Sequence, residues 1–315
     1  MIDTYSYSKA RDEIKKIEPN KSTKLTSWIR IVEPNPEKIK FFSDNTGIPE
    51  AELLESLEEE ERPKVSQGKY LEIIYRAPYT VDRELETLPV YFYLFPKKIV
   101  TVEKKPLRIM DSIAENMLHN KNKFLFRKGL PYFIFHVIDQ INDDFLMRID
   151  QIASRIDIYE NFSKKEMSVR DIEKVYDQSV TLSFFNQALI ANVEVLNILK
   201  KGYFRLIPVK DRVLFEELYF NVLQILDTEK IQREAVTNLI NVHSIITSSR
   251  LNEFMKRLTI IALIVAIPTF FTGIYGMNFD YIPFAEHAYG FFIVSSLIIL
   301  ITILIFFIFK KLDWL

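Results

Sequence analysis

The sequence contains no cysteine, and only seven of its 315 residues are glycine. Without cysteine the chain can form no disulfide, thiolate metal site or cysteine nucleophile. The 41 Lys and Arg residues are balanced by 42 Asp and Glu residues, so there is no excess positive charge to hold nucleic acid. The few glycines build no GxxxxGK[ST] phosphate loop. We therefore expect neither an enzyme, an ATP-driven pump nor a nucleic-acid-binding protein.

Two uncharged runs, residues 258–279 and 288–309, lie near the C-terminus. Each matches the roughly 20 residues that cross a hydrocarbon core of about 30 Å, so we predict two transmembrane helices in the lipid bilayer. Neither these runs nor the loop between them, residues 280–287, contains Lys or Arg. The loop carries Asp280 and Glu286, and we expect its negative charge to attract cations.

Basic residues flank the two runs on their outer sides. Arg250, Lys256 and Arg257 precede the first run, and the tail over residues 310–315 begins with two lysines. The positive-inside rule then places both ends in the cytoplasm. The N-terminal segment also lacks the apolar core of a secretory signal peptide. We expect an integral protein of the cell (inner or plasma) membrane, with most of the chain in the cytoplasm and the loop outside.

The sequence predicts an α+β multi-domain membrane protein. Residues 1–125 contain short runs of β-branched and aromatic residues, which indicate a cytoplasmic α/β domain. Residues 126–205 repeat apolar side chains at spacings of three and four, which predicts two long antiparallel helices. Residues 206–257 begin a third helix, a coiled stalk that runs into the first span because no Pro or Gly interrupts it before Pro268. The predicted strands are 25–32, 71–75, 90–95 and 99–102, and the predicted helices of these parts are 49–61, 131–161, 168–200 and 211 onward.

One line along the first span, continued into the stalk, carries mostly small or polar side chains. On a helical wheel these residues fall within about 40° of each other, and the other faces are bulky. The line is either a seam for close helix packing or the wall of a pore that several copies of the helix surround. Two spans cannot enclose a channel, so a pore requires an oligomer. The residues are Met255, Leu258, Ala262, Ala266, Thr269, Gly273 and Gly276; we call them the small-residue stripe.

The first span ends in Tyr275-Gly276-Met277-Asn278, which places an amide side chain at the external membrane boundary. An Asn at such a position can also be the left-handed cap of a helix. Followed by a second span, a short loop between the two and a basic tail, this tetrapeptide closely resembles the CorA family of magnesium transporters. The resemblance implies a funnel-shaped homopentamer, in which the first span lines the pore and the second span packs outside it.

The resemblance also implies roles for individual residues. The last three residues of the tetrapeptide correspond to the selectivity filter, and Met255 and Leu258 lie where the family has its hydrophobic constriction. Thr269 agrees with the family's pore face. Many relatives follow the motif with Met-Pro-Glu and end in a longer lysine run. This chain instead has Ile-Pro-Phe, its glutamate is displaced to Glu286, and its tail has two lysines.

The residue types at the motif suit a hydrated magnesium ion. Mg²⁺ prefers octahedral oxygen coordination and releases its waters reluctantly. Five neutral Asn278 side chains can accept hydrogen bonds from those waters without holding the ion as tightly as carboxylates would. The driving force is then the membrane potential, about 4.6 kcal/mol per 100 mV for a divalent cation.

Transport down a gradient needs a gate, and the family resemblance implies that cytoplasmic Mg²⁺ closes it by bridging acids of neighbouring subunits. Two readings of the function remain beside Mg²⁺ conduction. One is a transporter whose main cargo is Co²⁺, Ni²⁺ or Zn²⁺, and the other is a non-conducting helical scaffold tethered to the membrane. The candidate regulatory ligands are Glu216, Glu217, Asp82, Glu84 and Glu86.

Overall fold

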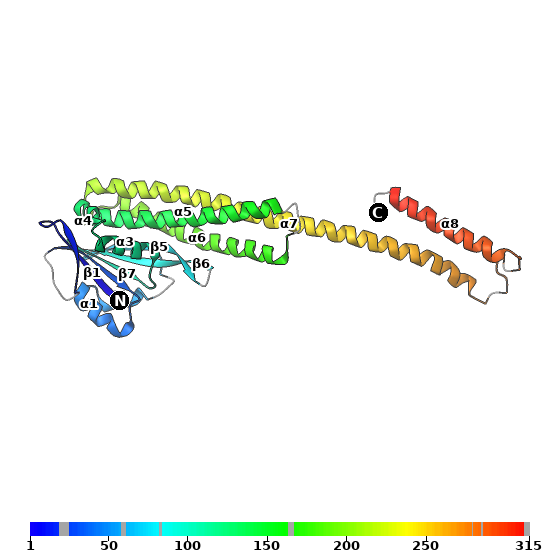
Figure 1. Ribbon diagram of the computed structural model, residues 1–315, viewed down its shortest axis with the longest axis horizontal. Helices are drawn as coiled ribbons and strands as arrows, with labels where there is room; N and C mark the ends of the chain where they lie inside the picture. Colours follow the sequence, from blue (N-terminus) through cyan, green and yellow to red (C-terminus); the bar gives the residue numbers. More distant parts are fainter. Residues whose placement is uncertain are drawn as a thin grey trace. The chain divides into compact units, whose positions relative to one another are not determined.

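The computed structural model consists of two compact units, Met1–Leu239 and Ile240–Leu315. Helix α7, Arg212–Tyr275, contributes residues to both, and helix α8, Gly290–Lys311, belongs to the second. Figure 1 shows a β-sheet with helices in the first unit and helices alone in the second. The predicted order, an α/β part followed by long helices and apolar C-terminal helices, is confirmed. The residues that the structure describes are 1–18, 25–57, 61–81, 84–162, 167–278, 280–284 and 286–311.

Within these residues, seven strands form one sheet in the order β2-β1-β3-β7-β6-β5-β4. Only β3 and β7 pair in parallel, with Arg30 opposite Thr101. The four predicted strands are confirmed as β3, β5, β6 and β7, although β5 and β6 are longer than predicted. The strands β1, β2 and β4 were not predicted. The bounds are β1 Ile2–Ser8, β2 Glu13–Ile17, β3 Thr26–Val32, β4 Lys64–Gln67, β5 Leu71–Val81, β6 Glu84–Leu94 and β7 Lys98–Glu103.

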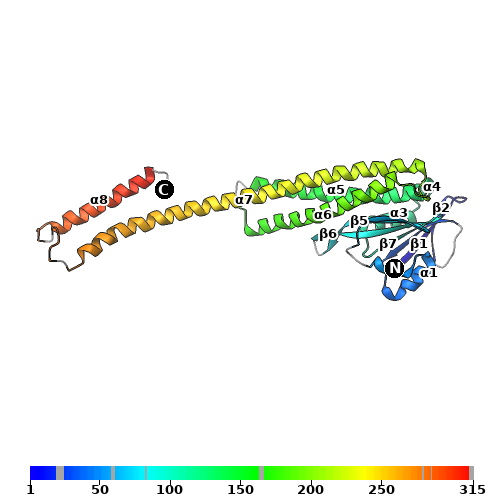
Figure 2. The same ribbon diagram turned by 180° about the vertical axis from the view of Figure 1, so that it is seen from behind.

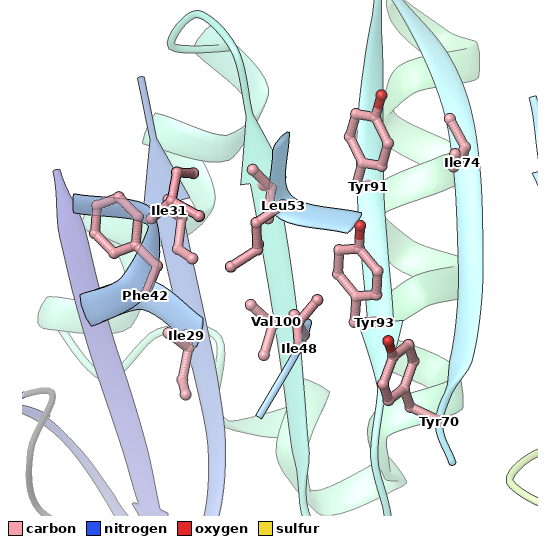
Figure 3. Packing of buried hydrophobic residues seen from close by; sticks show 12 residues of the cluster. Ile29, Ile31, Phe42, Ile48, Leu53, Tyr70, Ile74, Tyr91, Tyr93 and Val100 are labelled. Atoms are coloured by element: carbon pink, nitrogen blue, oxygen red, sulfur yellow. The ribbon is translucent and has the colours of Figure 1, made fainter. Parts of the chain in front are cut away.

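Both faces of the sheet are covered. On one face, Trp28 of β3 packs against Phe133 of a long helix, with ring centroids 5.2 Å apart. The other face carries a second apolar core, in which Phe42 and Leu53 from two short helices meet Tyr93 and other sheet residues (Figure 3). The short helices are α1 Ile39–Thr46 and α2 Glu50–Glu55; the first face bears α3 Arg108–Leu118, α4 Lys123–Lys128, α5 Leu130–Phe162 and α6 Val169–Lys201.

The predicted helix over residues 49–61 is too long. Helix α2 ends at Glu55, and the backbone N–H of Ser56 caps it by donating to Glu52. The hydroxyl of Ser56 donates to the carbonyl oxygen of Leu53, 2.7 Å away. This side-chain bond satisfies the carbonyl group of Leu53, which a longer helix would bond to a backbone N–H. Glu61 is not helical, and residues 58–60 lie outside the described part of the chain.

The long helices agree with their predicted periodicity. The apolar row predicted for α5 is buried. Helix α6 begins after Ser168, whose side chain forms a capping box with Asp171, and both views show α5 beside the first part of α7 (Figures 1 and 2). The third predicted helix is α7, 64 residues with Pro268 inside it, which makes it about 95 Å long. The division at residues 125, 205 and 257 stays a prediction.

Three helices in the described part of the chain are long and apolar enough to cross a membrane: α6, α7 and α8. The apolar window of α6 is 44% buried, whereas those of α7 and α8 are 6% and 0% buried. Helix α6 buries one face, which includes Leu182, Phe185 and Leu196, in the first unit, where it packs on the sheet. Its hydropathy is therefore explained by a protein core, and two spans remain the prediction.

A buried amide attaches α6 to the sheet. The side chain of Asn192, which is fully buried, accepts from the backbone N–H of Arg76 and donates to its carbonyl oxygen, both at 2.9 Å. The pairing of β5 with β4 ends at Ile74, two residues before Arg76. Asn192 thus provides the two bonds that a neighbouring strand would make.

We predict that Asn192→Ala destabilises the first unit by about 1–3 kcal/mol, because the partly buried N–H and carbonyl groups of Arg76 lose the hydrogen bonds that Asn192 makes. Thermal unfolding of the purified chain measures the loss. The matched control is Asn197→Ala on the same helix, where the side chain is partly exposed and the expected change is within about 0.5 kcal/mol. Equal effects of the two substitutions would mean that the bonds to Arg76 contribute nothing specific.

Candidate functional site

The small-residue stripe faces away from the second apolar helix. The covered residues of this part of α7 lie roughly half a turn from the stripe on the helical wheel. They are Ile260, Ile264, Ile267, Pro268, Phe271 and Tyr275. All seven stripe residues are exposed in the single chain. The stripe is therefore not a packing seam between the two helices of one chain. Only another molecule, or a pore lumen, can occupy that face.

Polar groups along the stripe are few and bound to their own helix. The hydroxyl of Thr269 donates to the carbonyl oxygen of Val265 at 2.7 Å, which leaves its lone pairs directed away from the backbone. Apart from its chain neighbours and the nearby backbone of its own helix, Gly273 has no atom within 4 Å of the position of a Cβ. Toward the N-terminal end of the stripe, Met255 and Leu258 are each about half exposed. The stripe thus runs from apolar side chains to small and hydroxyl-bearing ones.

The tetrapeptide forms the turn that ends α7. The helix stops at Tyr275, and the backbone N–H groups of Gly276 and Met277 donate to Thr272 and Ile274 at 3.0 and 3.1 Å. Asn278 follows with an exposed side chain and does not have a positive φ, so the left-handed cap is not its role. Its amide remains available to a ligand at this end of the helix.

The loop after the motif is held close to the two helices. Phe284 has a φ of 64°, a strained value for a bulky residue, and its carbonyl oxygen lies where a Cβ of Gly290 would be. Only glycine at position 290 allows this approach. A cavity of about 400 Å³ between the helix ends is lined by Tyr275, Gly276 and Phe284, among others. Asp280 and Glu286 are exposed.

Three of the five predicted regulatory acids have side chains that the structure describes, and these three lie on two different elements. Glu216 and Glu217 are exposed in the first turns of α7, whereas Glu86 lines a cavity of about 700 Å³ beside α6, together with Glu194. Asp82 lies outside the described residues, as does the side chain of Glu84. In the described part of the chain, no group of three or more His, Asp or Glu side chains could hold a metal ion.

Glu217 has an acidic neighbour on α5 that the residues around it in the sequence do not indicate. The pKa of Asp139 on α5 is raised, first by burial and then by the negative charges of Asp143 and Glu217. Asp139 therefore lies within electrostatic range of Glu217, the acid predicted as a ligand. The spacing of His136, Asp139 and Asp143 at i, i+3 and i+7 indicates that these three share one helix face, but it does not indicate that Glu217 lies near them.

Comparison with known proteins decides the family. The model of the family described as "CorA-like Mg2+ transporter protein" matches residues 24–311. The chain belongs to this family. It is 28% identical to the cobalt/magnesium transport protein CorA of Methanocaldococcus jannaschii, over 91% of this chain and 90% of the relative. Its identity to the protein of the same name from Thermotoga maritima is 26%, over 100% and 92%.

The fold of CorA agrees over the whole chain. The complete structure of the CorA magnesium transporter from Methanocaldococcus jannaschii matches with a TM-score of 0.90 and 26% identity, covering 100% of this chain and 99% of that one. Membership in this transporter family, with the apolar helices α7 and α8, makes the chain a membrane protein. The role of each residue in the CorA site remains a matter for proposal.

Proposed function

We propose that five copies of this chain form a funnel-shaped Mg²⁺ channel whose pore is lined by the small-residue stripe of α7. The observation that carries the proposal is the exposure of all seven stripe residues on the face turned away from α8. Small side chains on that face leave room on an axis shared by several helices. The relatives' names support Mg²⁺ as the cargo and Co²⁺ as a second one.

Selection is assigned to the outer end of the pore. A ring of Asn278 side chains accepts hydrogen bonds from the water shell of the ion, so a hydrated divalent cation passes without losing that shell. The backbone carbonyls of Gly273 and Gly276 add acceptors, because no side chain covers them. Asp280 and Glu286 raise the local concentration of cations at the mouth. Tyr275 supports the motif from the partly covered face of α7.

The gate is assigned to the opposite end of the stripe. Rings of Met255 and Leu258 narrow the path with apolar side chains, which can stop ions by excluding water. Entry through the open gate follows the membrane potential, without a chemical energy source. Cytoplasmic Mg²⁺ closes the gate by bridging acids of neighbouring chains, and Glu216 and Glu217 are the proposed ligands on α7. Their exposure in the single chain leaves them accessible to a neighbour.

Reconstituted uptake with internal Mg²⁺ varied tests conduction and feedback together. We expect Mg²⁺ to enter liposomes that are negative inside and the rate to fall as internal Mg²⁺ rises. A non-conducting scaffold would show no uptake. A channel whose main cargo is another divalent metal would carry that metal faster than Mg²⁺ in parallel vesicles.

We predict that the double variant Glu216→Gln, Glu217→Gln keeps conducting at internal Mg²⁺ concentrations that close the wild type. Two ligands per subunit are lost, so the affinity for inhibitory Mg²⁺ is expected to fall about tenfold or more. Mg²⁺ should also no longer protect the cytoplasmic part from protease. The control is Glu234→Gln, another exposed acid on α7. If protection survives the double substitution, the assignment of these two ligands is wrong.

A further inference from the structure

The buried residues of α7 in the first unit follow a heptad pattern. Their spacing alternates between three and four residues, as in a helix that packs lengthwise on its neighbours. Glu229 occupies one position of this row and is fully buried. Gln232, at the next position, is only partly buried. The apolar members are Phe215, Leu218, Val222, Ile225, Val236 and Leu239.

Glu229 has a specific partner on α6. The side-chain amide of Asn186 donates to one carboxylate oxygen at 2.6 Å. Arg233, one turn along α7, donates to the other oxygen at 3.1 Å. Burial raises the pKa of Glu229, and both partners oppose this by favouring the ionised form. A buried carboxylate with a single partner on the neighbouring helix is satisfied at one height along that helix only.

The apolar part of the row does not by itself fix that height. A slide of α7 by seven residues, about 10.5 Å, places apolar side chains against apolar side chains again. The connection between α6 and α7, residues 202–211, is ten residues long and could span up to about 33 Å when extended, so it permits such a slide. Glu229 does not, because a slide of seven residues takes it from Asn186 to the level of Ser179 or Val193. Val193 has no donor for the carboxylate, and Ser179 has a single hydroxyl in place of the amide of Asn186.

We infer that Glu229 is a positioning residue, whose bond to Asn186 holds α7 at one axial register on α6. A single polar residue in an apolar heptad row specifies register at some expense of stability. Helix α7 continues without a break to Tyr275, so its residues beyond the first unit inherit that register. The consequence for ion flow rests on the proposed function, but the register itself does not.

Cross-linking can read the register directly, since the chain has no cysteine of its own. The amino group of Lys200 on α6 lies 5.3 Å from the centre of the Phe220 ring on α7. In the observed register, a short bifunctional maleimide should therefore cross-link the pair Lys200→Cys with Phe220→Cys. Lys200→Cys with Val213→Cys, or with Asp227→Cys, reports a slide of seven residues in either direction. Positions 213, 220 and 227 are all exposed.

We expect the wild-type and Glu229→Gln backgrounds to cross-link only the 200–220 pair, because a Gln amide can keep the bond to Asn186. In Glu229→Leu the yield of the shifted pairs should rise at least about tenfold, since the row then has no fully buried polar residue. The matched control is Gln232→Leu, which removes a polar group from the same row but leaves the register bond. Cross-linking of the 200–220 pair alone in Glu229→Leu overturns the proposal, as do equal shifts in Gln232→Leu.

The double variant Glu229→Leu, Asn186→Leu covers the case in which the single variant does not fold, because it leaves no polar group of the pair without a partner. Shifted pairs must form in it too, and their absence also overturns the proposal. Mg²⁺ uptake is measured on the same variants without the engineered cysteines. If the wild type takes up no Mg²⁺, the proposed function fails while the cross-linking result stands by itself.

Discussion

Replacement of Asn278 by Ala is expected to reduce Mg²⁺ uptake by at least about tenfold and to lower the preference for Mg²⁺ over Na⁺. The exposed amide after α7 is the proposed contact with the water shell of the ion. A hydrogen bond to a charged group contributes about 1.5–3 kcal/mol, and 1.4 kcal/mol corresponds to a factor of ten. The loss applies to every copy around the pore at once. Uptake by reconstituted protein, with each cation offered separately, measures both effects.

Two further variants test whether the effect depends on the neutral amide itself and on its position at residue 278. Asn278→Asp replaces a neutral ring by a ring of carboxylates, which should bind Mg²⁺ more tightly and slow its release. Asn252→Ala changes an exposed Asn elsewhere on α7 and should leave uptake unchanged. If Asn278→Ala transports Mg²⁺ with unaltered selectivity, the amide ring is not the filter.

The parts of the fold that could be predicted are those whose side chains repeat with one clear period. The β-branched and aromatic runs of β3, β5, β6 and β7 and the 3–4 spacing of α5 identify elements that are buried along their length. The edge strands β2 and β4 are short and rich in Lys, Glu, Ser and Gln, so their sequences resemble loops. Such charged, short edges are what protects a sheet from pairing with other chains.

Strand β1 was missed for a different reason. Its buried faces alternate Tyr with Thr and Ser, and Tyr5 stacks on Trp28 with ring centroids 5.1 Å apart. The opposite side chains, Thr4 and Ser6, are also buried. A polar residue at a buried position gives no hydrophobic signal, so the local pattern resembles a solvated segment. Only the pairing with β2 and β3 reveals the strand.

The candidate site also has parts that could be predicted from the sequence and parts that could not. The stripe on α7 could be predicted because a helix fixes which residues share a face. Whether the proposed regulatory acids bind a metal ion could not be predicted, because an exposed Glu on a helix has the same local pattern whether or not a second chain supplies another ligand. Glu229 had a usable signal, since an acid in a buried heptad row needs a partner. The partner itself, Asn186, is 43 residues away, and no local pattern connects the two.

The largest expected effect on stability concerns a buried ion pair under α3. Arg30 of β3 donates from Nε and Nη2 to both carboxylate oxygens of Glu103, at 2.7 Å each. The side chain of Arg30 is 6% exposed and that of Glu103 is fully buried. The carboxylate also accepts from the backbone N–H of Leu107 at 3.1 Å. A bidentate pair of this kind satisfies both charges in a place that water does not reach.

We predict that Glu103→Ala destabilises the first unit by about 3–5 kcal/mol, because it leaves the guanidinium of Arg30 buried without its main partner. Asp111, 2.8 Å from the other nitrogen of Arg30, has a side chain that is 57% exposed, and it cannot compensate from its half-hydrated position. Thermal or denaturant unfolding of the purified chain measures the change. Asp111→Ala is the control, with an expected loss of no more than about 1 kcal/mol.

The double variant Arg30→Met, Glu103→Leu distinguishes the cost of an unpaired charge from the value of the pair. Apolar side chains of similar volume remove both charges together, so the double variant is expected to be within about 1–2 kcal/mol of the wild type even though Glu103→Ala is severe. That outcome would show that the ion pair contributes more to the specific position of α3 on the sheet than to the free energy of unfolding. If Glu103→Ala is as mild as Asp111→Ala, water reaches Arg30 and the pair is not buried in solution.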